Sequence, residues 1–186
     1  MEKKLKVAVY INGQWRGSSF KCSEYIKPYF EQFDVDYYIH TSEYYDGKSI
    51  NLDFSKNKVD LWASREIDEI YHSKQDIERI KNTYDNVVYF QVDSKEKNQE
   101  ITSLKNNIPS FHNIYGGYKC NQYRKLHENI SGFHYDVIIK IRPDIIFKKD
   151  THSNLKKLVK FISNNPNTFF SEHSLPTYSD IQPNMD

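Results

Sequence analysis

Residues 135–147 (YDVIIKIRPDIIF) constrain the fold more than any other stretch, because a run of β-branched residues is followed at once by a proline. The apolar run at 137–141 is too short for a typical helix, and branched side chains favour extended backbone, so it predicts a strand buried on at least one face. Pro143 has no N–H for a strand ladder and pushes the preceding residue toward extended geometry. The strand should therefore end near Arg142, with Asp144 just beyond it.

Two interpretations of Arg142 and Asp144 follow from this stretch. In open α/β sheets, ligands bind outside the carboxyl ends of the strands, and both residues would then belong to a binding site. A charged pair at the end of a strand is also typical of a solvated turn or a local ion pair. The rest of the chain has to distinguish the two.

Length and charge narrow the class of protein. The 186 residues suit one domain that buries a proper core. With 26 Lys and Arg against 25 Asp and Glu, and no basic block, we expect neither a nucleic-acid partner nor a polybasic membrane patch.

Cys22 and Cys120 fit no metal-ligand spacing and no disulfide framework, which predicts free thiols in a reducing compartment. The apolar run near the N-terminus is too short for a signal peptide or a transmembrane segment, so a cytoplasmic protein is expected.

Strand-like and helix-like patterns alternate along the chain, which predicts an α/β fold with a mostly parallel central sheet flanked by helices. Besides the strand at 137–141, strands are predicted at residues 5–11, 35–42, 87–92 and 168–170. Helices are predicted at residues 23–33, 67–84, 110–130 and 155–162, with a short one around 100–104. The polar stretch 44–59 shows no period and predicts a long loop.

The predicted helix at 110–130 has apolar residues every three or four places and Ser110 as a candidate N-cap. Gly116 and Gly117 lie inside it, and each glycine costs about 1 kcal/mol relative to alanine. Close approach of another backbone or of a ligand would offset this cost, and so would simple helix packing. Both explanations stay open.

The loop after the first strand is polar and bracketed by glycines (NGQWRGSS). In nucleotide-binding α/β domains this loop carries ligand-contacting backbone, although an ordinary strand-to-helix turn would look the same. The loop is neither a GxGxxG motif nor a Walker loop, so any phosphate contact would come from Arg16 or from backbone N–H groups. A lone histidine such as His40, near the end of the second strand, is more often structural, and contact with a ligand is the alternative.

Four patches stand in an order that resembles a family of small bacterial and large-virus glycosyltransferase-like proteins of the GT-A type. The patches are VAVYINGQWRG, FDVDYYIHTS, FHNIYGGYKCNQYRKLHE and YDVIIKIRPDIIF. They correspond to the family's "GQ.R", "IHTW"-like, "K.N" and "R.RPD" elements, with Lys140 at the first arginine place of the last one. The resemblance implies a Rossmann-like GT-A nucleotide-sugar-binding domain over residues 1–186. The family carries a further acidic motif beyond the place of Asp186, so a domain truncated at its C-terminus is an open alternative.

The resemblance also implies an activity. A glycosyltransferase of this type moves a sugar from a UDP-, GDP- or other nucleotide-linked donor to a hydroxyl group of a glycan or glycoconjugate acceptor. Two other classes stay open: a non-catalytic nucleotide-sugar-binding module, and another nucleotide-dependent α/β transferase. The latter would need a basic, glycine-rich triphosphate loop, which this sequence does not carry.

By position, the resemblance assigns donor contacts to the opening loop, the end of the second strand and the late helix. The donor-binding candidates are Asn12, Gly13, Gln14, Arg16, His40, Thr41, Lys119 and Asn121. The catalytic candidates are Arg142 and Asp144, and Asp144 corresponds to the acid that holds Mn²⁺ or Mg²⁺ on the donor diphosphate.

The sequence departs from the family's DxD pattern, because Arg142 occupies the first acidic place. Asp136 cannot replace it, since an extended chain would put it about 26 Å from Asp144. We therefore expect a metal held by Asp144 with phosphate oxygens and water. The alternative is that Arg142 contacts the diphosphate directly and the metal is weak or absent.

Overall fold

The computed structural model describes residues 4–46, 51–53, 58–60, 69–103, 111–145, 151–165 and 168. The chain divides into two compact units, Met1–Lys148 and Lys149–Asp186. In the second unit the described element is the helix α5 (Thr151–Asn164), which confirms the helix predicted at 155–162. Leu155 and Val159 are its buried apolar side chains.

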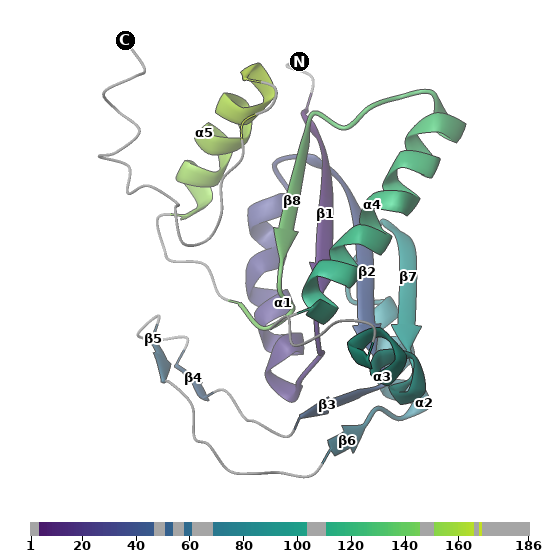
Figure 1. The fold of residues 1–186 in the computed structure, drawn as a ribbon. Helices are drawn as coiled ribbons and strands as arrows, with labels where there is room; N and C mark the ends of the chain where they lie inside the picture. The colour runs from purple at the N-terminus through teal and green to yellow at the C-terminus, as the bar shows by residue number, and fades with distance from the viewer. Residues whose placement is uncertain are drawn as a thin grey trace. The chain divides into compact units, whose positions relative to one another are not determined.

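The first unit is built on a four-stranded sheet. Its strands are β1 (Lys6–Asn12), β2 (Asp34–Ser42), β7 (Val87–Asp93) and β8 (Val137–Ile141). They lie in the order β7-β2-β1-β8, and all three pairings are parallel. Figure 1 shows the four strands side by side, so that their carboxyl ends meet at one edge of the sheet. The predicted parallel sheet, and four of its predicted strands, are confirmed.

Two helices cover opposite faces of this sheet, as Figure 1 shows for α1 (Gly17–Phe30) and α4 (Phe111–Ser131). The ring of Phe30 in α1 meets Tyr37 edge to face, with centroids 6.3 Å apart. The thiol of Cys120 in α4 lies 3.5 Å from the backbone oxygen of Tyr38. Because successive residues of a strand point to opposite faces, β2 is buried on both sides.

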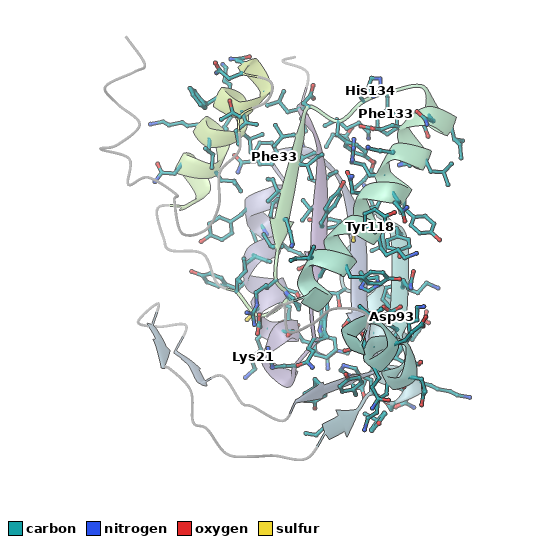
Figure 2. All side chains as sticks on the ribbon, in the orientation of Figure 1. Lys21, Phe33, Asp93, Tyr118, Phe133 and His134 are labelled. Carbon is teal, nitrogen blue, oxygen red and sulfur yellow. The ribbon has the colours of Figure 1, made fainter. Side chains whose placement is uncertain are left out.

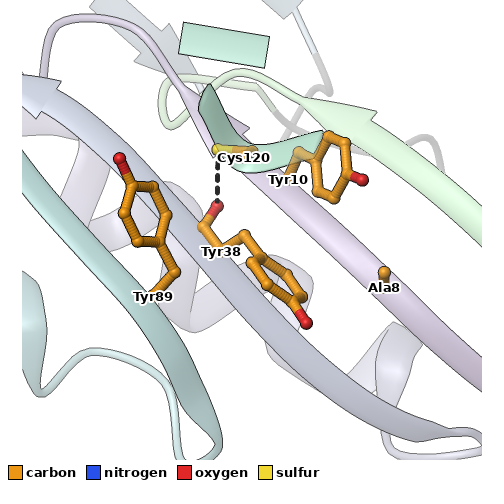
Figure 3. Close-up of a cluster of buried hydrophobic side chains, with 5 residues drawn as sticks. All are labelled: Ala8, Tyr10, Tyr38, Tyr89 and Cys120. Atoms are coloured by element: carbon orange, nitrogen blue, oxygen red, sulfur yellow. Dashed lines mark hydrogen bonds between the residues drawn. The ribbon is translucent and has the colours of Figure 1, made fainter. Parts of the chain in front are cut away.

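The core under α4 consists of Ala8, Tyr10, Tyr38, Tyr89 and Cys120 (Figure 3). Cys120 and Cys22 are both free and buried. Burial raises the pKa of each thiol to about 12, so both stay protonated near neutral pH. These thiols act as small apolar core residues.

Four short strands lie where the sequence predicted a loop and a helix. The loop predicted at 44–59 is wrong in part, because β3 (Tyr44–Asp46) pairs with β6 (Glu69–Tyr71), and β4 (Asn51–Asp53) pairs with β5 (Lys58–Asp60). The helix predicted at 67–84 is wrong over β6, where pairing with a distant strand overrides a local helical pattern.

Local capping explains where the helices begin. α2 (Lys74–Lys81) starts after Ser73, whose hydroxyl accepts a hydrogen bond from the Asp76 N–H, while the Asp76 carboxylate accepts one from the Ser73 N–H. α1 begins earlier than predicted, because the Ser19 hydroxyl accepts a hydrogen bond from the Arg16 N–H. α3 (Lys95–Ser103) is longer than the predicted helix at 100–104. Ser110, Leu104 and residues 169–170 lie outside the described residues.

The two glycines of α4 have different neighbours. A Cβ on Gly116 would lie 3.0 Å from Nδ1 of His40 and 3.1 Å from Cβ of Asn12. A Cβ on Gly117 would lie 3.4 Å from the Lys140 amine, which is the movable end of a long side chain. Tight packing of α4 on the side chains of His40 and Asn12 therefore explains Gly116, and this favours helix packing, the second of the two explanations that the sequence left open.

We expect Gly116→Ala to lower the free energy of unfolding by about 1–3 kcal/mol, because His40 and Asn12 would have to move. The matched variant Gly117→Ala should be neutral, or stabilising by up to about 1 kcal/mol, since alanine favours the helix. Urea unfolding of both variants is the measurement. Equal effects of the two substitutions would contradict the close approach at Gly116.

Candidate functional site

The carboxyl ends of the strands place several predicted residues in one row. In the sheet register Gln91 pairs with His40, and His40 pairs with Asn12. Ile11 pairs with Ile141, so the next step of the same register puts Arg142 beside Asn12. With strands about 4.8 Å apart, His40 and Arg142 stand roughly 10 Å apart across this edge.

Asp144 is the centre of an arginine cluster that joins two distant parts of the chain. Its Oδ2 accepts a hydrogen bond of 2.6 Å from Nη1 of Arg16 and one of 2.8 Å from Nη2 of Arg142, whereas its Oδ1 accepts one of 2.9 Å from Nε of Arg142. The Asp144 side chain is 1% exposed and that of Arg16 is 11% exposed. The Arg142 side chain is 42% exposed, so a ligand can reach it from solvent.

The loop after β1 supplies Arg16 through a tight turn. Gly13 has φ of 133°, a conformation that side chains rarely adopt, and its N–H donates to the His40 carbonyl over 3.2 Å. Gln14 accepts a hydrogen bond of 3.2 Å from Nη2 of Arg16. The loop predicted to bind the donor thus lies against the end of β2 and against the arginine cluster.

His40 forms a buried pair with Asp93, the last residue of β7, and its Nε2 lies 3.0 Å from Oδ2 of Asp93. The Gln91 amide donates to Oδ1 of the same carboxylate over 2.5 Å. Burial by itself raises the pKa of Asp93, but the hydrogen bond and charge of His40, helped by Gln91 and Lys119, hold that pKa below its ordinary value. Asp93 lies at the strand ends near α3 and α4 (Figure 2).

Sequence reasoning missed Asp93, although a signal was present. The residue directly follows the predicted strand at 87–92, and the same rule that selected Arg142 applies to the carboxyl end of every parallel strand.

The other predicted residues divide into two groups. The Lys119 amine lies 5.6 Å from the Tyr115 ring centroid, and its charge acts on Asp93, so it belongs near the strand ends. Asn121 instead accepts hydrogen bonds from the Tyr10 hydroxyl and from Arg124, in the interface between α4 and β1.

Several buried polar atoms have no hydrogen-bond partner among the residues that the structure describes. They are Nε1 of Trp15, Oγ of Ser18, Oγ1 of Thr41 and Nε2 of His72. Thr41 points to the opposite face of β2 from His40, by strand alternation. Buried polar groups are normally bonded, so such atoms typically mark places where water or a ligand completes the structure.

A divalent metal does not fit Asp144 as it is arranged here. Both carboxylate oxygens accept hydrogen bonds from guanidinium groups, and two arginines around one aspartate leave a net positive charge that repels a cation. Over the described part of the chain, no group of three or more His, Cys, Asp and Glu side chains could hold a metal ion.

Comparisons with protein-family models, with curated proteins and with solved structures find no match.

Proposed function

We propose that this chain is a glycosyltransferase of the GT-A type, which binds a nucleotide-sugar donor at the carboxyl edge of its sheet and transfers the sugar to a hydroxyl acceptor. The observation that carries the proposal is the cluster of Arg16, Asp144 and Arg142. Its parts come from the loop after β1 and the segment after β8, and these are two of the motifs that resemble the family.

The chemistry of the reaction explains the use of arginine. When the bond between sugar and phosphate breaks, negative charge grows on the departing nucleoside diphosphate, and a fixed cation stabilises that state more than the ground state. A guanidinium group offers paired N–H donors that match two phosphate oxygens. Arg142 is the exposed member of the cluster and is assigned this contact. Asp144 is a positioning residue that fixes the orientation of Arg142.

This arrangement supports direct contact between arginine and diphosphate, rather than a diphosphate held through Mn²⁺ or Mg²⁺ on Asp144. Asp144 already balances two guanidinium groups. The net positive charge that disfavours a metal ion also favours the diphosphate.

A thermal-shift screen tests the proposal. UDP, GDP, CDP, CMP and their sugar conjugates are added with Mn²⁺ or with EDTA. We expect at least one nucleoside diphosphate to stabilise the fold by about 2.7 kcal/mol at a concentration of 100 times its Kd, to a similar extent with the metal and with EDTA. Release of nucleoside diphosphate from the sugar conjugate then measures turnover. The absence of any shift would contradict the proposal, whereas a shift without turnover would indicate a binding module.

The variant Arg142→Gln should weaken binding of that diphosphate by about 10- to 100-fold, because it removes a charge-assisted contact. Lys140→Gln is the matched control, since it removes the same charge two residues earlier on β8. Isothermal titration calorimetry measures both variants. Equal weakening by the two substitutions would mean that only net charge matters and would remove Arg142 from the site.

A further inference from the structure

The helix α4 meets the sheet through polar contacts as well as apolar ones. It is 21 residues long, and within the described ranges no helix has the length and apolarity to cross a bilayer. It runs antiparallel to the strands, so its C-terminal half lies beside their amino ends (Figure 1). A cluster of hydrogen-bonded side chains joins the helix to β2 there, away from the arginine cluster at the carboxyl ends.

The cluster consists of two tyrosines, a histidine and an aspartate. The Tyr38 hydroxyl of β2 lies 2.9 Å from Nδ1 of His127 in α4 and 2.8 Å from the hydroxyl of Tyr135. The Tyr135 hydroxyl lies 3.1 Å from the same histidine nitrogen and donates over 2.6 Å to Oδ2 of Asp36 in β2. Four ionisable side chains thus share one network, and the proposed function does not use any of them.

Both hydroxyl groups of the cluster keep their protons near neutral pH. Burial raises the pKa of Tyr38 to about 12. Burial, followed by the hydrogen bond to Asp36, raises the pKa of Tyr135 well above its ordinary value. A tyrosine hydroxyl has one proton to donate. The two tyrosines therefore bring two protons to the network.

The carboxylate of Asp36 fixes the direction of the Tyr135 proton. Its Oδ2 accepts from the Tyr135 hydroxyl and also lies 3.3 Å from Nζ of Lys6. A carboxylate between an ammonium group and a hydroxyl group acts as an acceptor. The Tyr135 proton is therefore used toward Asp36 and is not available to the other members of the cluster.

The remaining contacts require one more proton, and only the histidine can supply it. If Tyr38 donated to His127, the oxygens of Tyr38 and Tyr135 would face each other at 2.8 Å with no proton between them. If Tyr38 donates to Tyr135 instead, its 2.9 Å contact with His127 requires a proton on Nδ1. Only the second arrangement leaves no two acceptors in direct contact.

We propose that His127 carries its proton on Nδ1 and begins a one-way chain of hydrogen bonds that latches the C-terminal half of α4 to the sheet. In this chain Nδ1 donates to Tyr38, Tyr38 donates to Tyr135, and Tyr135 donates to Asp36. Among the described residues Nε2 of His127 has no hydrogen-bond partner, and it does not belong to the buried polar atoms, so its lone pair faces solvent.

The charged groups around the latch have partners of their own. Glu128 accepts a hydrogen bond of 3.0 Å from the Tyr135 N–H and one of 2.5 Å from Arg124. Lys6 donates to Asp34 over 3.2 Å in addition to its contact with the latch. In the described part of the chain these groups are occupied elsewhere, and they leave the tyrosines as the partners of the imidazole.

The position of the proton can be measured directly in the full chain. A long-range proton–nitrogen NMR correlation at about pH 8, where an ordinary histidine is neutral, distinguishes the two tautomers of each imidazole. The His127 signals are assigned by their loss in His127→Asn. We expect His127 with a protonated Nδ1 and an unprotonated Nε2. A His127 signal with its proton on Nε2 would overturn the proposal, whether or not the chain binds a nucleotide.

The variant Tyr135→Phe should reverse the tautomer. Without that hydroxyl, Tyr38 is free to donate to Nδ1, so the proton of His127 moves to Nε2. Tyr123→Phe is the matched control, because it removes a hydroxyl from an exposed tyrosine of α4 outside the latch, and it should keep the wild-type tautomer. Thermal unfolding checks that both variants fold. An unchanged tautomer in folded Tyr135→Phe would overturn the chain, and the wild-type spectrum decides alone if that variant does not fold.

Discussion

Replacing Asp144 by alanine is expected to lower the free energy of unfolding by about 3 kcal/mol. Two guanidinium groups share this carboxylate, and Arg16 and Asp144 are both largely buried. Removing one partner of a buried ion pair leaves a charge without compensation, at a cost of roughly 3–5 kcal/mol. We expect a cost near the lower end of this range, because the Arg142 side chain is partly exposed to solvent.

The prediction for Asp144 is tested by urea unfolding at neutral pH. Asp85→Ala is the control, because Asp85 is an exposed carboxylate whose loss should change stability by less than about 0.5 kcal/mol. In the double variant Arg16→Met with Asp144→Ala, the loss should be smaller than the sum of the two single losses, since each single change already breaks the same contact. Additive losses would contradict the direct bond between Arg16 and Asp144.

The second large effect is expected at the end of β7, where Asp93 faces His40. Asp93→Asn should lower the free energy of unfolding by about 3 kcal/mol at neutral pH. The substitution removes the charge that faces His40 in a buried position. The effect should also depend on pH in a direction that follows from the lowered pKa of Asp93. A carboxyl whose pKa is lower in the folded chain adds stability above its unfolded-state pKa and loses that contribution as the pH falls through its folded-state pKa.

Unfolding midpoints of wild type and Asp93→Asn should therefore differ by a constant amount from pH 7 to about pH 5, and the difference should shrink below about pH 4. Asp85→Asn serves as the control and should show no difference at any pH. If the difference in unfolding midpoint between wild type and Asp93→Asn stayed the same below about pH 4, the prediction would be wrong. The charged Asp93 carboxylate would then not be stabilised by His40, Gln91 and Lys119.

The sheet was predictable because its signal is local. Runs of β-branched and aromatic residues, such as those of β1 and β8, are hydrophobic enough to be buried wherever the chain folds. Pro143 and Gly13 marked the ends of strands for steric reasons that do not depend on the rest of the fold. The antiparallel pair of β3 and β6 was not predictable, because its strands are short and each gains hydrogen bonds only from the other.

The site was predictable in part. The rule on strand ends selected Arg142 and Asp144, and the structure brings both to Arg16. The rule also applied to Asp93, which was overlooked. Asn121 was assigned to the donor by its position in a motif, and in the structure its side chain accepts hydrogen bonds from Tyr10 and Arg124.

The amino-acid sequence by itself determined which segments form the parallel strands and which residues follow their ends, because branched side chains, glycine and proline act on their own backbone. Only the tertiary structure decided that Asp144 is shared by two arginines, that His40 meets Asp93, and that α4 leaves apolar side chains such as Leu126 and Ile130 exposed. Each of these depends on contacts between residues far apart in the chain, and periodicity alone cannot say which face of a helix meets a sheet. Close approach at Gly116 and burial of Glu128 determine that orientation.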